Sequence, residues 1–163
     1  MPSSLDRRGF VAATAAAIGA AVLFRPSRGG AAAFPVAHSG ADWHRILEPR
    51  RFAVLRHAAT EAPFSSPLLK EHRRGTFVCA GCELALFSST TKFDSGTGWP
   101  SFYAPIEGAV ATERDTAFGM VRTAVHCRRC GGHLGHVFDD GPKPTGLRYC
   151  MNGVALVFKP QPT

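Results

Sequence analysis

Five cysteines in two kinds of setting are the residues of this sequence best suited to chemistry. Four of them form two C-x-x-C pairs, Cys79 with Cys82 and Cys127 with Cys130, whereas Cys150 stands alone in "RYCMN". Two such pairs can supply four thiolates to one tetrahedral ion, and sulfur ligands favour zinc, with iron a lesser possibility. A closed four-thiolate site leaves the ion no open position, so catalysis would have to use other residues.

Two other interpretations of the paired cysteines stay open at this stage. They could form two disulfides in an oxidising compartment, or one pair could be a redox-active dithiol. Neither alternative explains why both pairs have the same spacing at the ends of β-type runs, next to glycines that permit tight turns. The pattern therefore favours one structural zinc ion bound by all four cysteines.

The lone Cys150 is a candidate nucleophile because of the residues around it. "GGHLGH" places His133 and His136 three residues apart, so both reach one site only if the glycines bend the strand. Asn152 lies two residues after Cys150 and, on a strand, would share its face and donate hydrogen bonds there. A nearby imidazolium would lower the pKa of the thiol. The alternative is a buried, inert cysteine with histidines that pack in the core or bind zinc.

Trp99, in "GTGWPSF", is a further candidate site residue. It follows flexible glycines and is restrained by the proline after it. Such a residue is either a core tryptophan or a wall for an apolar group of a ligand. Both interpretations stay open from the residues alone.

The elements that must position these residues are short. Apolar residues recur at helical spacing over Ala41–His57, with a capping signal at Ser39 and with Pro49 dividing the segment into two helices. From Gly75 onward, β-type runs alternate with glycine-rich turns. The runs are Thr76–Cys79, Leu84–Phe87, Met120–His126, His133–Phe138, Leu147–Asn152 and Val154–Phe158. The pattern predicts a mainly β, antiparallel fold with short N-terminal helices packed outside it.

The N-terminal segment, residues 1–33, resembles a twin-arginine export signal. "DRRGF" precedes the uncharged apolar run Val11–Phe24, which is shorter than the roughly 20 residues of a membrane span. Three alanines at 31–33 offer a cleavage site, which would leave residues 34–163 as the mature domain in the periplasm. An uncleaved N-terminal membrane anchor and a cytosolic tail are the alternatives.

Length and charge limit the classes of function. A chain of 163 residues with 45% hydrophobic and 19% charged residues is ordinary for one globular domain. Of the net charge of +7, residues 1–33 account for +3 (four arginines and one aspartate), which leaves +4 on residues 34–163. So small an excess gives no reason to expect a nucleic-acid partner.

Three stretches together resemble the B-type peptide methionine sulfoxide reductases, which act on the R epimer of methionine sulfoxide. They are "TEAPFSSPL", "CAGCELALFSSTTKFDSGTGWPSFYAPI" and "VHCRRCGGHLGHVFDDGPKPTGLRYCMN", and the resemblance covers about residues 39–159. It implies a compact fold of two antiparallel sheets and a structural zinc ion on the four paired cysteines. Oxidised proteins would be the substrates, a thioredoxin-like or other thiol the reductant, and a monomer the expected state.

The resemblance also implies roles for single residues. Cys150 matches the nucleophile; His133, His136 and Asn152 match active-site positions; Trp99 matches the tryptophan of the substrate pocket.

One position departs from many members of that family, which keep a resolving cysteine two residues before the tryptophan. This chain has Thr97 there. The departure predicts a one-cysteine cycle, in which an external thiol reduces the oxidised Cys150. The rival function is a zinc-ribbon-like binding module without catalysis, in which alkylation of Cys150 would have no effect. A third hypothesis, a hydrolase that acts on acidic substrates, has less support, because the sequence shows no conspicuous pair of carboxylates.

Overall fold

The computed structural model of the chain describes residues 34–162. The export signal predicted for residues 1–33 lies outside these residues. Among the described helices, none is both long enough and apolar enough to cross a membrane.

Two short helices begin the described chain, as the sequence predicted. Helix α1 spans Gly40–Ile46 and helix α2 spans Pro49–His57. The Ser39 hydroxyl accepts a hydrogen bond from the N–H of Asp42 at 3.1 Å, which is an N-cap contact. Pro49 is the first residue of α2, where its missing N–H costs no helical hydrogen bond.

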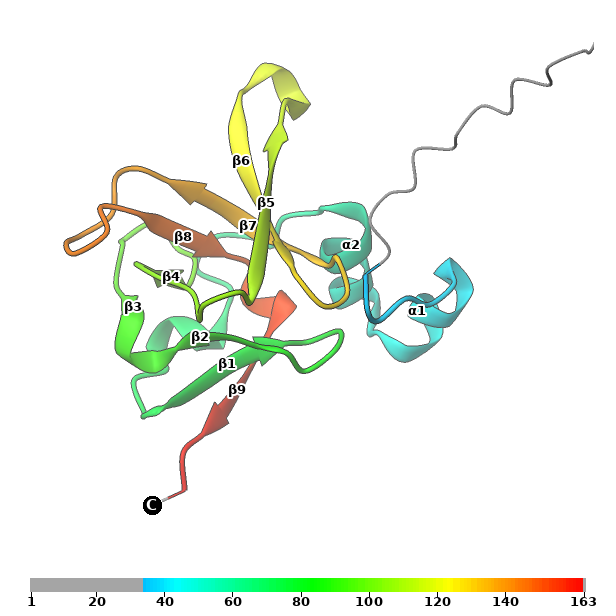
Figure 1. Cartoon of the computed structure of the whole chain (residues 1–163), viewed down its shortest axis with the longest axis horizontal. Coiled ribbons are helices and arrows are strands. Elements are labelled where there is room, and N and C mark those ends of the chain that lie inside the picture. Colours follow the sequence, from blue (N-terminus) through cyan, green and yellow to red (C-terminus); the bar gives the residue numbers. More distant parts are fainter. Residues whose placement is uncertain (1–33, 163) are drawn as a thin grey trace, which may run out of the picture. The chain divides into compact units, whose positions relative to one another are not determined.

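The strands of the described chain form two antiparallel sheets (Figure 1). The small sheet has the order β2-β1-β9, and the large sheet has the order β3-β4-β8-β7-β6-β5. The strands are β1 (Gly75–Cys79), β2 (Ala85–Ser88), β3 (Lys92–Phe93), β4 (Ser101–Phe102), β5 (Val110–Asp115), β6 (Arg122–Cys127), β7 (His133–Phe138), β8 (Arg148–Met151) and β9 (Leu156–Pro160). Short 3-10 turns interrupt them: η1 (Pro67–Lys70), η2 (Ser89–Thr91), η3 (Ala117–Gly119) and η4 (Gly153–Ala155).

Aromatic side chains join the two sheets into one core. Phe77 of β1 and Phe87 of β2 pack on Phe102 of β4, with ring centroids 5.0 Å and 4.4 Å apart. All three phenylalanines are fully buried. Helix α2 packs against β7 and η4 through its buried residues Val54 and Leu55, and Figure 1 shows it beside β7. The predicted mainly β fold with two antiparallel sheets and outer helices is confirmed.

The observed elements differ from the predicted ones in two respects that affect the site. The sequence interpretation contained no strand at β3, β4 or β5, although β4 lies next to the strand that carries Cys150. The run predicted to begin at Val154 becomes a strand only at Leu156, because η4 precedes it. Asn152 therefore lies just after β8 rather than on it, as the N-cap residue of η4.

Candidate active site and metal cluster

The two C-x-x-C pairs form matching turns at the ends of β1 and β6. In each turn, the N–H of the residue after the second cysteine donates to the carbonyl of the first: Glu83 to Cys79 and Gly131 to Cys127, both at 2.8 Å. Both donors adopt the left-handed conformation, with φ 59° at Glu83 and 67° at Gly131. The equal spacing in the sequence therefore gives the same local geometry twice.

The four sulfur atoms of these turns lie within 4.8 Å of one another. The Cys79 and Cys130 sulfurs are 3.7 Å apart, and the Cys82 and Cys127 sulfurs are 3.5 Å apart. A tetrahedral ion with Zn–S bonds of about 2.3 Å places its sulfurs about 3.8 Å apart, so the spacing fits a four-thiolate zinc site. It does not fit the disulfide alternative, which requires about 2.05 Å, and the cysteines of the described chain are free.

Burial and mutual contact make the cluster suited to a cation. The pKa of Cys130 is lowered to about 4, because hydrogen bonds with Cys127 and then Cys79 stabilise its thiolate. The pKa of Cys79 is raised, because hydrogen bonds with Cys127 and Cys130 retain its proton and burial opposes its charge. Four thiolates at this distance repel one another, and a divalent ion would offset that repulsion.

Cys150 lies on β8 and lines a small cavity of about 160 Å³. Ligand pockets for drug-sized molecules measure about 300–1,000 Å³, so this cavity has room for a group the size of one side chain. The other lining residues are Thr60, Trp99, Arg122, Gly135, His136, Phe138 and Asn152. The structure thus brings together Cys150, His136, Asn152 and Trp99, whereas His133 lies outside this lining.

The pairing of β7 with β8 places His136 directly opposite Cys150. Directly opposite residues of neighbouring strands project to the same face of a sheet, so the imidazole and the thiol share one face. Gly135 permits this pairing, because a Cβ at that position would lie 2.1 Å from the carbonyl oxygen of Cys150. The bend that the glycines were expected to supply is present: the register shifts beside His126, and the rings of His133 and His136 are 5.3 Å apart.

A charged network orients His136. Its Nε2 lies 2.7 Å from Oδ2 of Asp115, and Arg122 donates to the same oxygen at 2.7 Å. The pKa of Asp115 is lowered to about 2, first by the N–H of Ala117 and then by His136 and Arg122, so this carboxylate is ionised near neutral pH. An ionised Asp115 favours the form of His136 that carries a proton on Nε2.

His133 has a different environment. It is 4% exposed, and neither of its ring nitrogens has a hydrogen-bond partner in the described part of the chain. Burial lowers the pKa of His133 to about 4, with the neighbouring His126 and His136 adding to the effect. With a pKa of about 4 the ring is a neutral imidazole near pH 7, so it is not the imidazolium that would act as a general acid there.

Asn152 and Trp99 are both held by the backbone of Glu61. The Asn152 side-chain oxygen accepts from the Glu61 N–H at 2.9 Å, and its nitrogen donates to the Leu134 carbonyl at 3.1 Å. The indole N–H of Trp99 donates to the Glu61 carbonyl at 3.1 Å. One N–H of Asn152 is left for a ligand, since the amide group has two and Leu134 uses one.

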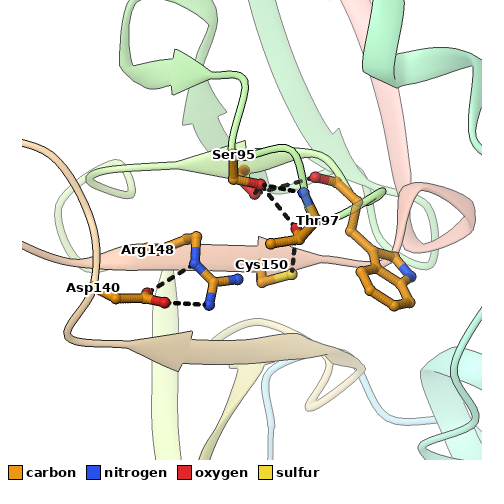
Figure 2. Close-up of polar contacts among 7 residues, drawn as sticks. Ser95, Thr97, Asp140, Arg148 and Cys150 are labelled. Atoms are coloured by element: carbon orange, nitrogen blue, oxygen red, sulfur yellow. Dashed lines mark hydrogen bonds and ion pairs between the residues drawn. The ribbon is translucent and has the colours of Figure 1, made fainter. Parts of the chain in front are cut away.

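Figure 2 shows the polar side chains around the Cys150 thiol. Thr97 Oγ1 lies 3.8 Å from its sulfur, and Arg148, on the same face of β8, forms two hydrogen bonds of 2.8 Å with Asp140. Burial raises the pKa of Cys150 above its ordinary value, although Thr97, Arg148 and Ser101 each favour the thiolate. The residue is therefore a protonated thiol near neutral pH, with groups beside it that lower the cost of ionisation.

The sequence interpretation gave no role to several residues of this site. The position of Arg148 could have been predicted from the sequence, since it lies two residues before Cys150 on a predicted strand and so shares its face. Glu61 was part of the "TEAPFSSPL" stretch, but its contacts are with distant residues. Asp115 and Arg122 become neighbours of His136 only through the register of β5, β6 and β7, which no local pattern fixes.

The fold and the site together define a class: a two-sheet β protein with a four-cysteine cluster suited to a metal ion and a separate thiol in a side-chain-sized cavity. The model of the SelR domain matches residues 47–160 of this chain. The peptide methionine sulfoxide reductase MsrB of Bradyrhizobium diazoefficiens is 57% identical over 127 residues, which are 77% of this chain and 91% of that protein. The MsrB of Agrobacterium fabrum is 53% identical over 123 residues, 75% of this chain and 91% of its own length.

The MsrB of Pseudomonas putida strain W619 is similar to the same degree, 56% identical over 121 residues, 74% of this chain and 91% of that protein. The chain therefore belongs to the MsrB family of peptide methionine sulfoxide reductases and is an oxidoreductase. The family resemblance predicted from the sequence is confirmed.

Proposed function

We propose that this enzyme reduces methionine-R-sulfoxide, mainly in oxidised proteins, to methionine. The observation that carries the proposal is the register of β7 and β8, which places His136 opposite Cys150 inside a cavity with room for one side chain. The relatives are named as peptide methionine sulfoxide reductases, which supports a peptide-borne substrate. Trp99, on the same cavity, would contact the S-methyl group, and an apolar slot for one methyl contributes about 1–3 kcal/mol of discrimination.

The chemical step needs a nucleophile and an acid. A sulfoxide sulfur is electrophilic, but its oxygen leaves poorly unless it is protonated. Cys150 attacks that sulfur while protonated His136, held by Asp115, delivers a proton to the oxygen, and the free N–H of Asn152 donates to it. General acid catalysis of this kind contributes about 10²–10⁴-fold in rate. His133, with its lowered pKa, is not the acid in this mechanism.

The reaction balances as an oxygen transfer. The S–O bond of the substrate breaks, the oxygen ends on the sulfur of Cys150 as a sulfenic acid, and methionine leaves. Methionine sulfur gains the two electrons that Cys150 loses. An external thiol, of thioredoxin-like or other type, then attacks the sulfenic acid, which forms a mixed disulfide and releases one water molecule. A second thiol resolves the mixed disulfide, which restores the Cys150 thiol and leaves the reductant as a disulfide. Thr97 has no thiol, and the remaining cysteines form the metal cluster.

The four-cysteine cluster would hold one zinc ion per chain with a structural role. Held by Cys79 and Cys82 after β1 and by Cys127 and Cys130 after β6, the ion would join a turn of the small sheet to a turn of the large sheet. When bound, it supplies folding free energy, because a site of this kind does not exist in the unfolded chain. No reaction step uses it.

For residues 1–33 we propose export by the twin-arginine route to the periplasm, with an uncleaved N-terminal anchor as the alternative. The support is the sequence: two adjacent arginines before a modest apolar run and a small-residue cleavage site. Conversion of Arg7 and Arg8 to lysine should leave a full-length protein in the cytoplasm. A processed periplasmic protein from that variant would contradict the twin-arginine route.

The test of the catalytic proposal compares the two epimers and one variant in single turnover. Methionine-R-sulfoxide should be reduced and the S epimer should not. His136→Ala should slow methionine formation by about 10²-fold or more, with a changed pH profile, whereas His133→Ala should retain the wild-type pH profile. Equal reduction of both epimers, or a wild-type rate from His136→Ala at every pH, would refute the assignment.

A further inference from the structure

A second and larger cavity adjoins the Cys150 cavity. It measures about 640 Å³ and lies between the β5–β6 hairpin and residues 57–60 at the end of α2; we call it the hairpin groove. Thr60, Arg122 and His136 line both the groove and the Cys150 cavity, so the two spaces lie side by side. The mechanism above uses only the smaller of them.

Buried polar atoms without a partner gather along this groove. Among the described residues, the buried side-chain nitrogens that lack a hydrogen bond belong to Arg122, His126 and His133, all of which line the groove. His126 Nε2 lies 2.9 Å from Glu113 Oε1, as in an ion pair, but forms no hydrogen bond with it. Buried polar groups are nearly always paired in folded proteins, so unpaired nitrogens in three residues that line one cavity indicate a ligand with hydrogen-bonding groups. The nitrogens themselves are covered in this structure, so small side-chain movements would bring them to that ligand.

The tip of the β5–β6 hairpin borders the same groove with apolar side chains. Phe118, in η3, is 90% exposed and lines the groove. It adopts the left-handed conformation, with φ 58°, which is rare for a bulky residue. Met120 and Val121 beside it are exposed as well. Figure 1 shows this hairpin extending beyond the other strands of the large sheet.

We propose that the hairpin groove binds the polypeptide segment next to the oxidised methionine, an inference that rests on the proposed function. The Cys150 cavity accepts one side chain, so the main chain of a protein substrate must continue into an adjoining space, and the groove shares three lining residues with that cavity. Peptide groups of the segment supply acceptors for Arg122 Nε and a partner for His133. Phe118 contacts an apolar side chain that flanks the methionine.

The groove is lined by charges of both signs. Glu113 and Asp115 are negative, and Arg114 and Arg122 are positive. Net charge therefore does not select the segment. The apolar hairpin tip selects it instead, so we expect a peptide whose methionine sulfoxide lies between leucines to be preferred over one in which it lies between glycines.

The experiment measures single-turnover reduction, without reductant, of three substrates: free methionine-R-sulfoxide, and two short peptides that carry it between leucines or between glycines. For Phe118→Ser, the rate constant for the leucine-flanked peptide relative to free methionine-R-sulfoxide should fall about tenfold, since one apolar contact is worth that much discrimination. The glycine-flanked peptide should change less. Ile46→Ser, at a 57% exposed position on α1 away from the groove, should leave all ratios unchanged.

Three results would overturn the inference. An unchanged ratio in Phe118→Ser, with wild-type reduction of free methionine-R-sulfoxide intact, would refute the groove and leave the proposed function standing. A loss seen only in multiple turnover with a protein thiol reductant would assign the groove to the reductant instead. A wild-type chain that reduces none of the three substrates would refute the proposed function and the groove with it.

Discussion

Two opposing influences act on the thiol of Cys150. Burial raises its pKa, and this effect outweighs those of the Thr97 and Ser101 hydroxyls and the Arg148 guanidinium, which lower it. A raised pKa means that the thiolate fraction is small near neutral pH and increases as the pH rises through and beyond the ordinary range of a thiol. The thiol would therefore lose its proton only as it reacts with the substrate. This agrees with a site where an acid and a nucleophile act together.

Replacement of Arg148 by methionine should make Cys150 less reactive. The substitution removes the positive charge on the face of β8 that carries the thiol, so the pKa of Cys150 should rise further. Alkylation by iodoacetamide at pH 7 should slow about tenfold, with the rate profile displaced to higher pH. Asp140→Asn keeps the arginine and serves as the control, with little change expected. An Arg148→Met profile that coincides with wild type would show that the guanidinium does not act on the thiol.

Replacement of Thr97 by cysteine should convert the cycle into a two-cysteine one. The Thr97 hydroxyl lies 3.8 Å from the Cys150 sulfur, so a thiol at that position is within reach of a sulfenic acid after modest side-chain rotation. After stoichiometric turnover, peptide mapping without reductant should find a disulfide between positions 97 and 150. Thr112→Cys on β5, separated from β8 by β6 and β7, should form none. A sulfenic acid that persists in the Thr97→Cys variant would contradict the expected proximity.

At the scale of the elements, the sequence predicts what depends on local pattern. Both helices, the capping residue Ser39 and the strands that carry the cysteines and histidines were predicted within a few residues. Strands β3 and β4 have two residues each and offer no periodicity, and β5 reads "VATERD", whose central residues are exposed and charged or polar. These strands exist because neighbours in the sheet pair with them, which no local pattern shows.

The turn η4 shows how a distant residue overrides a local pattern. "VALVF" is apolar and β-branched, which predicts a strand from Val154. The carboxylate of Glu61 accepts hydrogen bonds from the N–H groups of Gly153 and Val154, so these two residues form a 3-10 turn instead. The same residue holds Asn152 and Trp99 by its backbone, and could not be assigned before its partners were known.

Glu61→Gln should therefore weaken both the fold and the site. The amide keeps one acceptor but turns an N–H donor toward a backbone donor, in a side chain that is buried. Hydrogen bonds to a buried charged group are worth about 1.5–3 kcal/mol, so the free energy of unfolding in urea should fall by about 2 kcal/mol. KM for methionine-R-sulfoxide should rise, because repulsion between the new amide and the N–H groups of η4 displaces the Glu61 backbone, whose N–H and carbonyl hold Asn152 and Trp99. Glu83→Gln, at an exposed surface pair with Lys159, should change neither quantity. Wild-type stability for Glu61→Gln would contradict this account of η4.

At the scale of the whole molecule, the four-cysteine cluster and the Cys150 thiol lie apart, which agrees with the proposed division between stability and chemistry. The cluster joins the two sheets through turns at the ends of β1 and β6, whereas Cys150 lies on β8 with no sulfur of the cluster in its cavity. The sequence predicted this division from cysteine spacing alone, because two identical turns at strand ends suffice to form a four-sulfur cluster. The position of the Cys150 cavity relative to the four-cysteine cluster could not be predicted from the sequence, because it depends on how the strands pair.

Cys82→Ser should release zinc and lower the midpoint of thermal unfolding, because metal binding free energy is folding free energy in such sites. Cys150→Ser should keep one zinc ion per chain and wild-type unfolding, and should lose all reductase activity. Metal analysis measures the zinc content of both variants, and calorimetry measures their midpoints of thermal unfolding. Loss of zinc from Cys150→Ser would show that the ligand set was assigned wrongly.

In the proposed cycle, Cys150 takes the oxygen from the sulfoxide, and no second thiol of this chain resolves the sulfenic acid. The most direct measurement is mass spectrometry of the wild-type protein after one equivalent of methionine-R-sulfoxide, without reductant and with a sulfenic-acid trapping reagent. We predict one equivalent of methionine, near-complete trapping at Cys150 and a zinc cluster that is still intact. Methionine formation together with release of metal and a disulfide from Cys150 to Cys79, Cys82, Cys127 or Cys130 would rule out this one-cysteine cycle.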